Sequence, residues 1–149
     1  MIRRYTVEEI YAAPGFAEMV AEYALMADPD MPAPTFRKDD YQAIEQSDRL
    51  GVYGAMDRDK LVGFVAVVKG YLPKFGVPVA ITESIFVLKK YRTKGYGIRL
   101  LQATEDYARV NGLQHCFVNI PDHAVKSLGL VLLHRNYSAK IHTYGKVLW

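Results

Sequence analysis

The chain has 149 residues, of which 50% are hydrophobic and 23% are charged. This composition is typical of a folded globular protein and excludes an intrinsically disordered one. By length we expect one domain over residues 1–149, which on folding would bury roughly 70% of the surface that the unfolded chain exposes. A single cysteine, Cys116, excludes an intrachain disulfide and a cysteine-based zinc site.

The apolar segments are too short for a membrane anchor. The longest, residues 61–68 and 128–133, fall far below the length of a membrane span, so we expect no membrane partner. The first residues, MIRRYTVEEIYAA, lack the apolar core of a secretory signal, and we expect a cytoplasmic protein. None of the four histidines is spaced four residues from another histidine or from a suitable Glu, so we expect no metal site.

The net charge is +3, but the basic residues are unevenly distributed. Between Ser84 and Thr104 there is no acidic residue, and the basic ones are Lys89, Lys90, Arg92, Lys94 and Arg99. The rest of the chain carries more acidic than basic residues. A basic segment of this kind favours one anionic ligand, and the alternative is an ordinary solvated positive surface.

The first half of the chain predicts two helices and several strands. Residues 2–5 are a short strand candidate, and apolar residues recur at helical spacing from Phe16 onward. Prolines at 29, 32 and 34 end that helix because they remove backbone donors and fix φ. The other elements that we expect here are a helix at 38–47, strands at 50–56 and 61–68 that form a hairpin, an aromatic loop at 70–78, and a strand at 80–88.

The second half contains the clearest helix, residues 95–111, which Gly112 ends. We expect its polar stripe to include Arg99 and Asp106, and its buried side to include Ile98, Leu101 and Ala108. A strand at 115–120, a helix at 124–135 and a terminal hairpin at 138–148 should follow. Because strands and helices do not alternate regularly, we expect an α/β (α+β) fold with a mixed sheet and helices on both faces.

Residues 81–101, ITESIFVLKKYRTKGYGIRLL, combine a strand end, a basic turn and a helix start. Gly95 and Gly97 would leave backbone N–H groups accessible, and the helix start adds unpaired N–H groups and the positive end of its dipole. Arg92, Lys94 and Lys89 would supply counter-charge. The segment therefore predicts a phosphate cradle, and the alternative is an ordinary strand-to-helix turn. It matches neither GxGxxG nor a P-loop.

The run Arg92-Thr-Lys-Gly-Tyr-Gly97 resembles the Arg/Gln-x-x-Gly-x-Gly/Ala motif of the GNAT superfamily of acetyl-CoA-dependent N-acetyltransferases. Its surroundings are also similar, since residues 83–87, the turn with Tyr91 and the helix that follows look like the family's central strand, loop and helix. The resemblance extends loosely over nearly the whole chain. It implies a single N-acetyltransferase domain with a largely antiparallel sheet that is splayed at the central strand.

This resemblance implies acetyl-CoA as the co-substrate. Its pyrophosphate would be held by the backbone amides of the motif, which by position are those of Thr93, Lys94, Gly95, Tyr96, Gly97 and Ile98, with Arg92 leading in. The backbone of Ile85, Phe86 and Val87 would pair with the pantetheine arm. For Ile85 and Val87 the alternative is plain core packing, and both interpretations can hold at once.

Glu83 is the candidate general base. A regular strand would place it on the same face as Ile81, Ile85 and Val87, where a lone carboxylate is costly unless it is paired or useful. Partial burial would raise its pKa toward neutrality, which suits a general base. Many GNAT enzymes have an acidic residue here that acts directly or through a water. The alternative is a Glu that pairs with a basic partner or reaches solvent.

The general acid is not assigned by the resemblance. The tyrosine that is usual in the family before the last hairpin is replaced by Leu132 or Leu133. Nearby substitutes are His134, Tyr137 and Tyr144. A thiol with a pKa of about 8.5 can also leave as thiolate near neutral pH, which makes an acid dispensable. The missing tyrosine leaves a non-catalytic acyl-CoA-binding or regulatory module as an alternative function.

The acceptor side of the family's site would be lined by aromatic, acidic and methionine residues of the first two helices and nearby loops: Tyr23, Met26, Asp28, Asp30, Met31, Phe36, Tyr41, Tyr71 and Phe75. Such a wall fits a cationic small-molecule amine, or a protein lysine or N-terminus. Nucleic acid is a poorer partner, because the 95–111 helix carries Glu105 and Asp106 beside its arginines. The open edge of the terminal hairpin would permit a homodimer.

Overall fold

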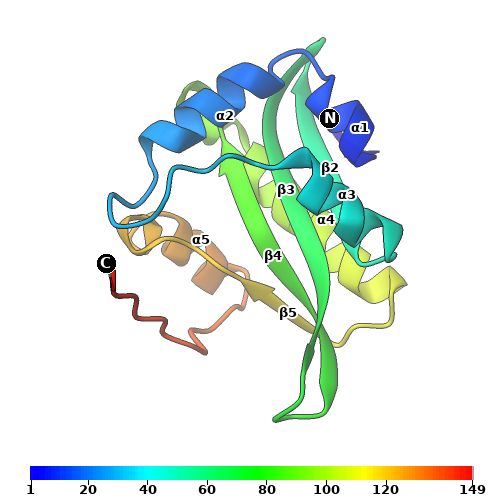
Figure 1. The fold of residues 1–149 in the computed structure, drawn as a ribbon, viewed down its shortest axis with the longest axis vertical. Helices are drawn as coiled ribbons and strands as arrows, with labels where there is room; N and C mark the ends of the chain where they lie inside the picture. Colours follow the sequence, from blue (N-terminus) through cyan, green and yellow to red (C-terminus); the bar gives the residue numbers. More distant parts are fainter. Residues whose placement is uncertain (149) are drawn as a thin grey trace.

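A computed structural model describes residues 1–148 as one five-stranded sheet with helices on both faces (Figure 1). The strands lie in chain order: β1 (Ile2–Tyr5), β2 (Leu50–Asp57), β3 (Lys60–Leu72), β4 (Val77–Val87) and β5 (His115–Val118). The first four are antiparallel, and β5 pairs parallel with β4. The predicted mixed, largely antiparallel sheet is confirmed.

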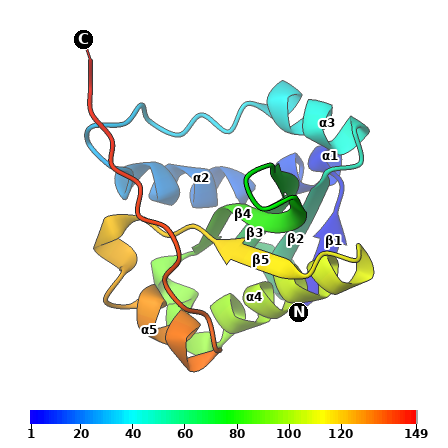
Figure 2. The ribbon, with the colours of Figure 1, turned by 90° about the horizontal axis from the view of Figure 1, so that it is seen from below.

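The helices form two layers, which are visible when the sheet is viewed edge-on (Figure 2). One layer holds α1 (Val7–Tyr11), α2 (Phe16–Leu25) and α3 (Lys38–Gln46), and the other holds α4 (Tyr96–Val110) and α5 (Leu128–His134). Residues 61–67 of β3 are buried because both faces of this central strand are covered. Among residues 1–148, none of the helices combines the length and the apolar character that crossing a membrane requires.

Helix α1 is an element that the sequence prediction missed. It begins with a capping box, in which Thr6 Oγ1 accepts a hydrogen bond from the Glu9 backbone at 3.1 Å and Glu9 Oε2 accepts one from the Thr6 backbone at 2.8 Å. The Ser/Thr-x-x-Glu spacing at residues 6–9 was the available signal. Val7 and Ile10 of this short helix are buried against the sheet.

The predicted aromatic loop at 70–78 is wrong. The strands β3 and β4 continue as a paired hairpin to Leu72 and Val77, and the turn between them is short. Pro78 is tolerated in β4 because β5 begins to pair with β4 only at Val79, so the proline lies beyond that pairing. In Figure 1 the tip of this hairpin projects away from α2 and the rest of the helices.

The predicted terminal hairpin at 138–148 is also wrong. These residues are exposed and form no strand, so the described sheet ends at β5 rather than at a hairpin. Alternating apolar residues specify a strand only where a neighbouring edge pairs with them, and here that pairing is absent. The helix predicted at 124–135 is shorter than expected, with a 3₁₀ turn at Asp122–Ala124 and α5 at Leu128–His134.

Gly15 docks the start of α2 onto β3, where the backbone N–H of Leu61 donates to Pro14 O at 2.8 Å. Its φ is +94°, and a Cβ at this position would lie 2.6 Å from the backbone oxygen of Leu61. Gly112, after α4, also has a positive φ of +68°, but a Cβ there would meet no atom within 4 Å. A side chain at Gly112 would therefore meet only backbone strain, whereas one at Gly15 would meet backbone strain and a steric clash.

Replacing each glycine with alanine should show this difference. Gly112→Ala should lower the free energy of unfolding by about 1 kcal/mol, because only the left-handed conformation is penalised. Gly15→Ala should lower it by about 3 kcal/mol, because the methyl group also collides with a strand backbone. Urea denaturation of both variants measures the difference, and equal losses would contradict the docking role of Gly15.

Candidate active site

The site begins where β4 and β5 separate. Their parallel pairing runs from Val79 opposite His115 to Thr82 opposite Val118 and then stops. Asn119 closes the end of this pairing, since its backbone N–H donates to Thr82 Oγ1 at 3.0 Å and its Nδ2 donates to Thr82 O at 3.4 Å. Beyond this point, within residues 1–148, no strand pairs with the β5-facing edge of β4.

Backbone hydrogen-bonding groups of β4 face this opening. The Leu88 N–H donates to Val62 O of β3 at 2.9 Å, and because neighbouring residues of a strand point their N–H groups to opposite edges, those of Ile85 and Val87 point away from β3. The Val87 carbonyl accepts from Arg92 Nε at 2.8 Å. The N–H groups of Ile85 and Val87 and the Ile85 carbonyl are therefore available to an extended ligand.

The start of α4 forms the second part of the site. The 3₁₀ helix η1 (Lys89–Lys94) ends at Gly95, whose φ of +81° turns the chain into α4. No side chain caps α4, and its first backbone bond is from Arg99 N to Gly95 O at 3.2 Å. The N–H groups of Tyr96, Gly97 and Ile98 precede that bond, and a Cβ on Gly97 would meet nothing within 4 Å. This is the open helix terminus that anions favour.

The side chains around the motif divide into buried aromatic rings and exposed residues, and one of them, Ile98, differs from the prediction. Tyr91 and Tyr96 are buried and meet edge to face at 6.3 Å, so the inner side of the turn is filled by aromatic rings. Ile98 is 42% exposed, which corrects its predicted place on the buried side of α4, although Leu101 and Ala108 are buried as predicted. Lys94 is exposed, with Nζ 5.0 Å from the centre of the Tyr91 ring.

Arg92 points toward the end of β4. Besides its bond to the Val87 carbonyl, it donates from Nη2 to Met26 Sδ at 3.1 Å and lies 5.3 Å from the centre of the Phe86 ring. Nearby, the Lys89 backbone donates to Glu22 Oε2 at 2.9 Å. The guanidinium therefore joins the end of β4 to Met26 at the end of α2.

Glu83 lies at a β-bulge. The β3–β4 register runs from Ala66 opposite Ser84 to Val67 opposite Thr82, so Glu83 is the extra residue and the alternation of side chains is broken there. The predicted shared face of Glu83, Ile85 and Val87 is therefore wrong. Glu83 lies on the face of α1–α3 with Ser84, whereas Val87 packs beside Leu100 of α4 on the other face.

The carboxylate of Glu83 is held by two hydroxyl groups. Tyr41 Oη on α3 donates to Glu83 Oε2 at 2.9 Å, and Ser84 Oγ donates to the same oxygen at 2.7 Å. The predicted partial burial is wrong, because the side chain is exposed. Glu83 thus reaches solvent while one of its oxygens stays in a fixed position.

Aromatic rings from α2, α3 and their connection surround this carboxylate. Tyr23 contacts Phe86 at 5.0 Å and Phe36 at 5.1 Å between ring centres, and Phe36 stacks on Tyr41 at 6.3 Å. Tyr11 donates a hydrogen bond to the Phe36 carbonyl. A cavity of only about 20 Å³ lies beneath the rings, so they form a packed wall.

The tyrosines of this wall are hydrogen-bond donors at neutral pH. Burial, followed by the charge of Glu83, raises the pKa of Tyr11 to about 12. Burial and Glu83 also raise the pKa of Tyr41, and burial raises that of Tyr23. The hydroxyl groups next to Glu83 are therefore neutral.

The predicted acceptor residues divide into two groups. Tyr23, Phe36 and Tyr41 come together beside Glu83, while Met26 contacts Arg92. The exposed residues that do not join this cluster are Asp28, Asp30, Met31, Tyr71 and Phe75; the last two belong to the projecting β3–β4 hairpin. The sequence prediction missed Tyr11 and Ser84. The capping signal before α1 could have found Tyr11, but the bulge that turns Ser84 toward Glu83 has no sequence signature.

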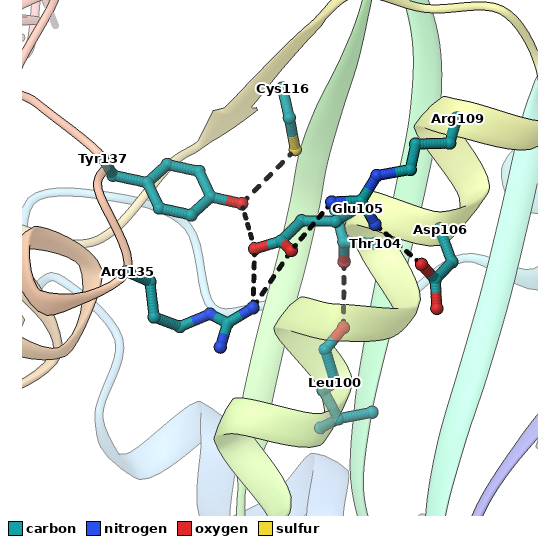
Figure 3. Close-up of polar contacts among 8 residues, drawn as sticks. All are labelled: Leu100, Thr104, Glu105, Asp106, Arg109, Cys116, Arg135 and Tyr137. Atoms are coloured by element: carbon teal, nitrogen blue, oxygen red, sulfur yellow. Dashed lines mark hydrogen bonds and ion pairs between the residues drawn. The ribbon is translucent and has the colours of Figure 1, made fainter.

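Tyr137, a substitute candidate for the general acid, is engaged elsewhere (Figure 3). Its hydroxyl donates to Glu105 Oε1 at 3.2 Å and contacts Cys116 Sγ at 3.8 Å, and Arg135 binds both oxygens of Glu105 at 3.0 Å. Burial raises the pKa of Tyr137, and Cys116 and Glu105 add to the effect. This network lies on the α4 face of the sheet, opposite the face of Glu83.

The leucines at the position of the family's tyrosine and the other two substitute candidates, His134 and Tyr144, differ in exposure. Leu132 is buried, Leu133 is 58% exposed and Tyr144 is 92% exposed. His134, at the end of α5, is exposed as well.

Within the described part of the chain, His, Cys, Asp and Glu side chains do not gather in a group of three or more that could hold a metal ion.

Comparisons with solved structures found similarity over the whole chain. A ribosomal-protein-alanine N-acetyltransferase from Brucella melitensis biovar Abortus 2308 is 21% identical, with a TM-score of 0.69 over 100% of this chain and 99% of that one. An aminoglycoside acetyltransferase from an uncultured soil metagenomic sample, in complex with sisomicin, is 16% identical, with a TM-score of 0.74 over 100% and 96%. The aminoglycoside N-acetyltransferase AAC(6')-Iy in complex with CoA is 19% identical, with a TM-score of 0.69 over 99% of each chain.

These similarities establish that the chain shares the fold of the three solved structures. No curated protein matches the sequence. The family model described as the Acetyltransferase (GNAT) family matches residues 14–131, which include the strand β4, the open start of α4 and Glu83. Because this match spans most of the chain and agrees with the splayed sheet, the chain belongs to the GNAT family of acetyltransferases.

Proposed function

We propose that this protein transfers the acetyl group of acetyl-CoA to a primary amine, with Glu83 as the general base, acting directly or through a water. The observation that carries this proposal is that three features of the site lie close together in one short segment of the chain. The unpaired edge of β4, the uncapped start of α4 and the exposed carboxylate of Glu83 all lie within residues 83–98.

For acetyl-CoA we propose two sets of backbone contacts. The pantetheine arm would run along Ile85, Phe86 and Val87 at the open edge of β4 and pair with the backbone of Ile85 and Val87, since the backbone groups of Phe86 face Phe64 of β3. The pyrophosphate would sit on the amides of residues 93–98. The surroundings of Gly97 support this proposal, because a Cβ built on this residue would meet no atom within 4 Å and the backbone there is open to a ligand. Arg92 would contribute by fixing the end of β4 through Val87 O. The solved neighbour that holds CoA is consistent with this co-substrate.

Proton removal is the step for which a base is required. An alkyl amine with a pKa of about 10.4 is neutral in only ~0.04% of molecules at pH 7. Glu83 would take a proton from the ammonium group, and the free lone pair would form the new C–N bond at the acetyl carbon. The C–S bond then breaks and the sulfur leaves as thiolate, which at a thiol pKa of about 8.5 needs no strong acid. The nitrogen, which becomes positively charged when the C–N bond forms, loses its second proton to this thiolate or to water, and the amide results. A positioned base typically contributes ~10²–10⁴-fold.

The acceptor that we propose is a cationic alkyl amine, either a small molecule or a protein lysine or N-terminus. The carboxylate of Glu83 attracts an ammonium group, and the faces of Tyr23, Phe36 and Tyr41 favour cations and alkyl chains. Both kinds of acceptor occur in the names of the structural neighbours, an alanine of a ribosomal protein and aminoglycosides.

Purified protein should release free thiol from acetyl-CoA when supplied with one of a panel of alkyl amines, aminoglycosides or lysine peptides. Mass spectrometry of the same sample should detect co-bound coenzyme A or its acetylated form. Binding of acetyl-CoA without turnover over the whole panel would instead favour the non-catalytic acyl-CoA-binding module, for which the leucines at 132 and 133 are the motivating observation.

Glu83→Gln should lower kcat by about 100-fold or more, because the amide keeps the shape of the side chain but cannot take a proton. The affinity for acetyl-CoA, measured by calorimetry, should not change, since the carboxylate lies on the α1–α3 face and not in the backbone cradle. Full turnover in this variant would remove Glu83 from the mechanism.

Gly97→Glu should weaken acetyl-CoA binding by more than about 10-fold, because it adds a negative charge where the diphosphate would bind. The same change should leave thermal stability intact or improve it, since a carboxylate is favourable in the first turn of a helix. Gln102→Glu, which adds the same charge to an exposed position later in α4, is the matched control and should bind normally. Equal effects of both variants would argue against a specific cradle at residue 97.

A further inference from the structure

We propose that Tyr41 and Ser84 are positioning residues for Glu83, and that by binding Oε2 together they assign proton transfer to the other oxygen, Oε1. This inference rests on the proposed function of Glu83 as the base. Tyr41 belongs to α3 and Ser84 to β4, so the carboxylate is fixed from the helix layer and from its own strand at once.

Both donors converge on one atom. The Tyr41 and Ser84 hydroxyl groups lie 2.9 Å and 2.7 Å from Oε2, and among residues 1–148 no hydrogen bond or ion pair reaches Oε1. A carboxylate has acceptor sites on each oxygen, so this pattern leaves one oxygen saturated by the protein and the other directed to solvent. An incoming ammonium group or its bridging water would therefore meet Oε1.

The fixed geometry matters because Glu83 is exposed. A solvated glutamate side chain samples several rotamers, and restricting it costs free energy unless hydrogen bonds hold it. The ring of Tyr41 is itself held by stacking on Phe36, which packs against Tyr23. The hydroxyl of Tyr41 is thus presented from a packed wall rather than from a mobile side chain.

The donors are neutral, which preserves the charge of the base. The titratable groups that face the Tyr41–Glu83 pair are Tyr11 on α1 and Tyr23 on α2, and Asp40 on α3 acts on Tyr11. Within the described chain, no Lys or Arg forms an ion pair with Glu83. A cation bound to the carboxylate would compete with the ammonium group of the acceptor, whereas hydroxyl groups orient the carboxylate without neutralising it.

Tyr41→Phe and Ser84→Ala test this proposal, because each removes one hydroxyl group and leaves the surrounding packing in place. Each variant should lower kcat about 10-fold with little change in the KM for acetyl-CoA, because the base is misplaced while the donor site is untouched. The double variant should lose less than the product of the two single losses, since both hydroxyl groups hold one carboxylate. Tyr53→Phe is the matched control, because Tyr53 contacts Tyr107 of α4 on the opposite face.

The decisive measurement introduces Tyr41→Phe into the Glu83→Gln background, with the folding of every variant checked by thermal melting. If Tyr41 acts only through Glu83, it should cause no further loss of turnover there. If Tyr41→Phe lowered kcat in the Glu83→Gln background by the same factor as in the unmodified protein, the positioning role would be overturned. Unchanged turnover in Tyr41→Phe alone would also overturn it, and both results would leave Glu83 as the base. Inactivity of the unmodified protein on every amine, or full activity of Glu83→Gln, would overturn the proposed function and this inference together.

Discussion

The separation of β4 from β5 after Thr82 is the constraint on which the rest of the structure depends. The strand β5 ends at Val118, and Asn119 then holds Thr82, the last paired residue of β4, through two hydrogen bonds. From that point one edge of β4 has backbone groups without a strand partner in the described chain. A sheet edge of this kind is normally a liability, and here it becomes an opening that an extended ligand can occupy.

The two faces of the sheet contribute different groups around this opening. On the α4 face, Glu105, Arg135, Tyr137 and Cys116 connect α4, β5 and the segment after α5, so the far wall of the opening is held in place (Figure 3). On the other face, α2 and α3 bring aromatic rings and the Tyr41 hydroxyl to Glu83. The bulge at Glu83 is what places the carboxylate on this second face.

Local hydrogen bonding decides which backbone groups of the motif at residues 92–97 stay unpaired. Gly95 adopts a left-handed conformation that ends one helix and begins the next, and the first N–H groups of α4 are left without a cap. Lys94 and Arg92 lie nearby, but the Arg92 side chain is engaged with Val87, Met26 and Phe86. The uncapped backbone N–H groups at the start of α4 and the Arg92 guanidinium are therefore both positive groups with a fixed position in the turn.

The sequence by itself determined the mixed fold, most of its strands and helices in their order, and the motif at residues 92–97, and it singled out Glu83 as a candidate, because turn residues, apolar periodicity and a glycine pair are local signals. Tertiary structure decided the rest. The face of Glu83 depends on a bulge, its partner Tyr41 lies 42 residues away, and Tyr137 joins Glu105 across 32 residues. Residues 138–148 alternate like a strand but lack a partner edge, since pairing is a property of two segments and not of one.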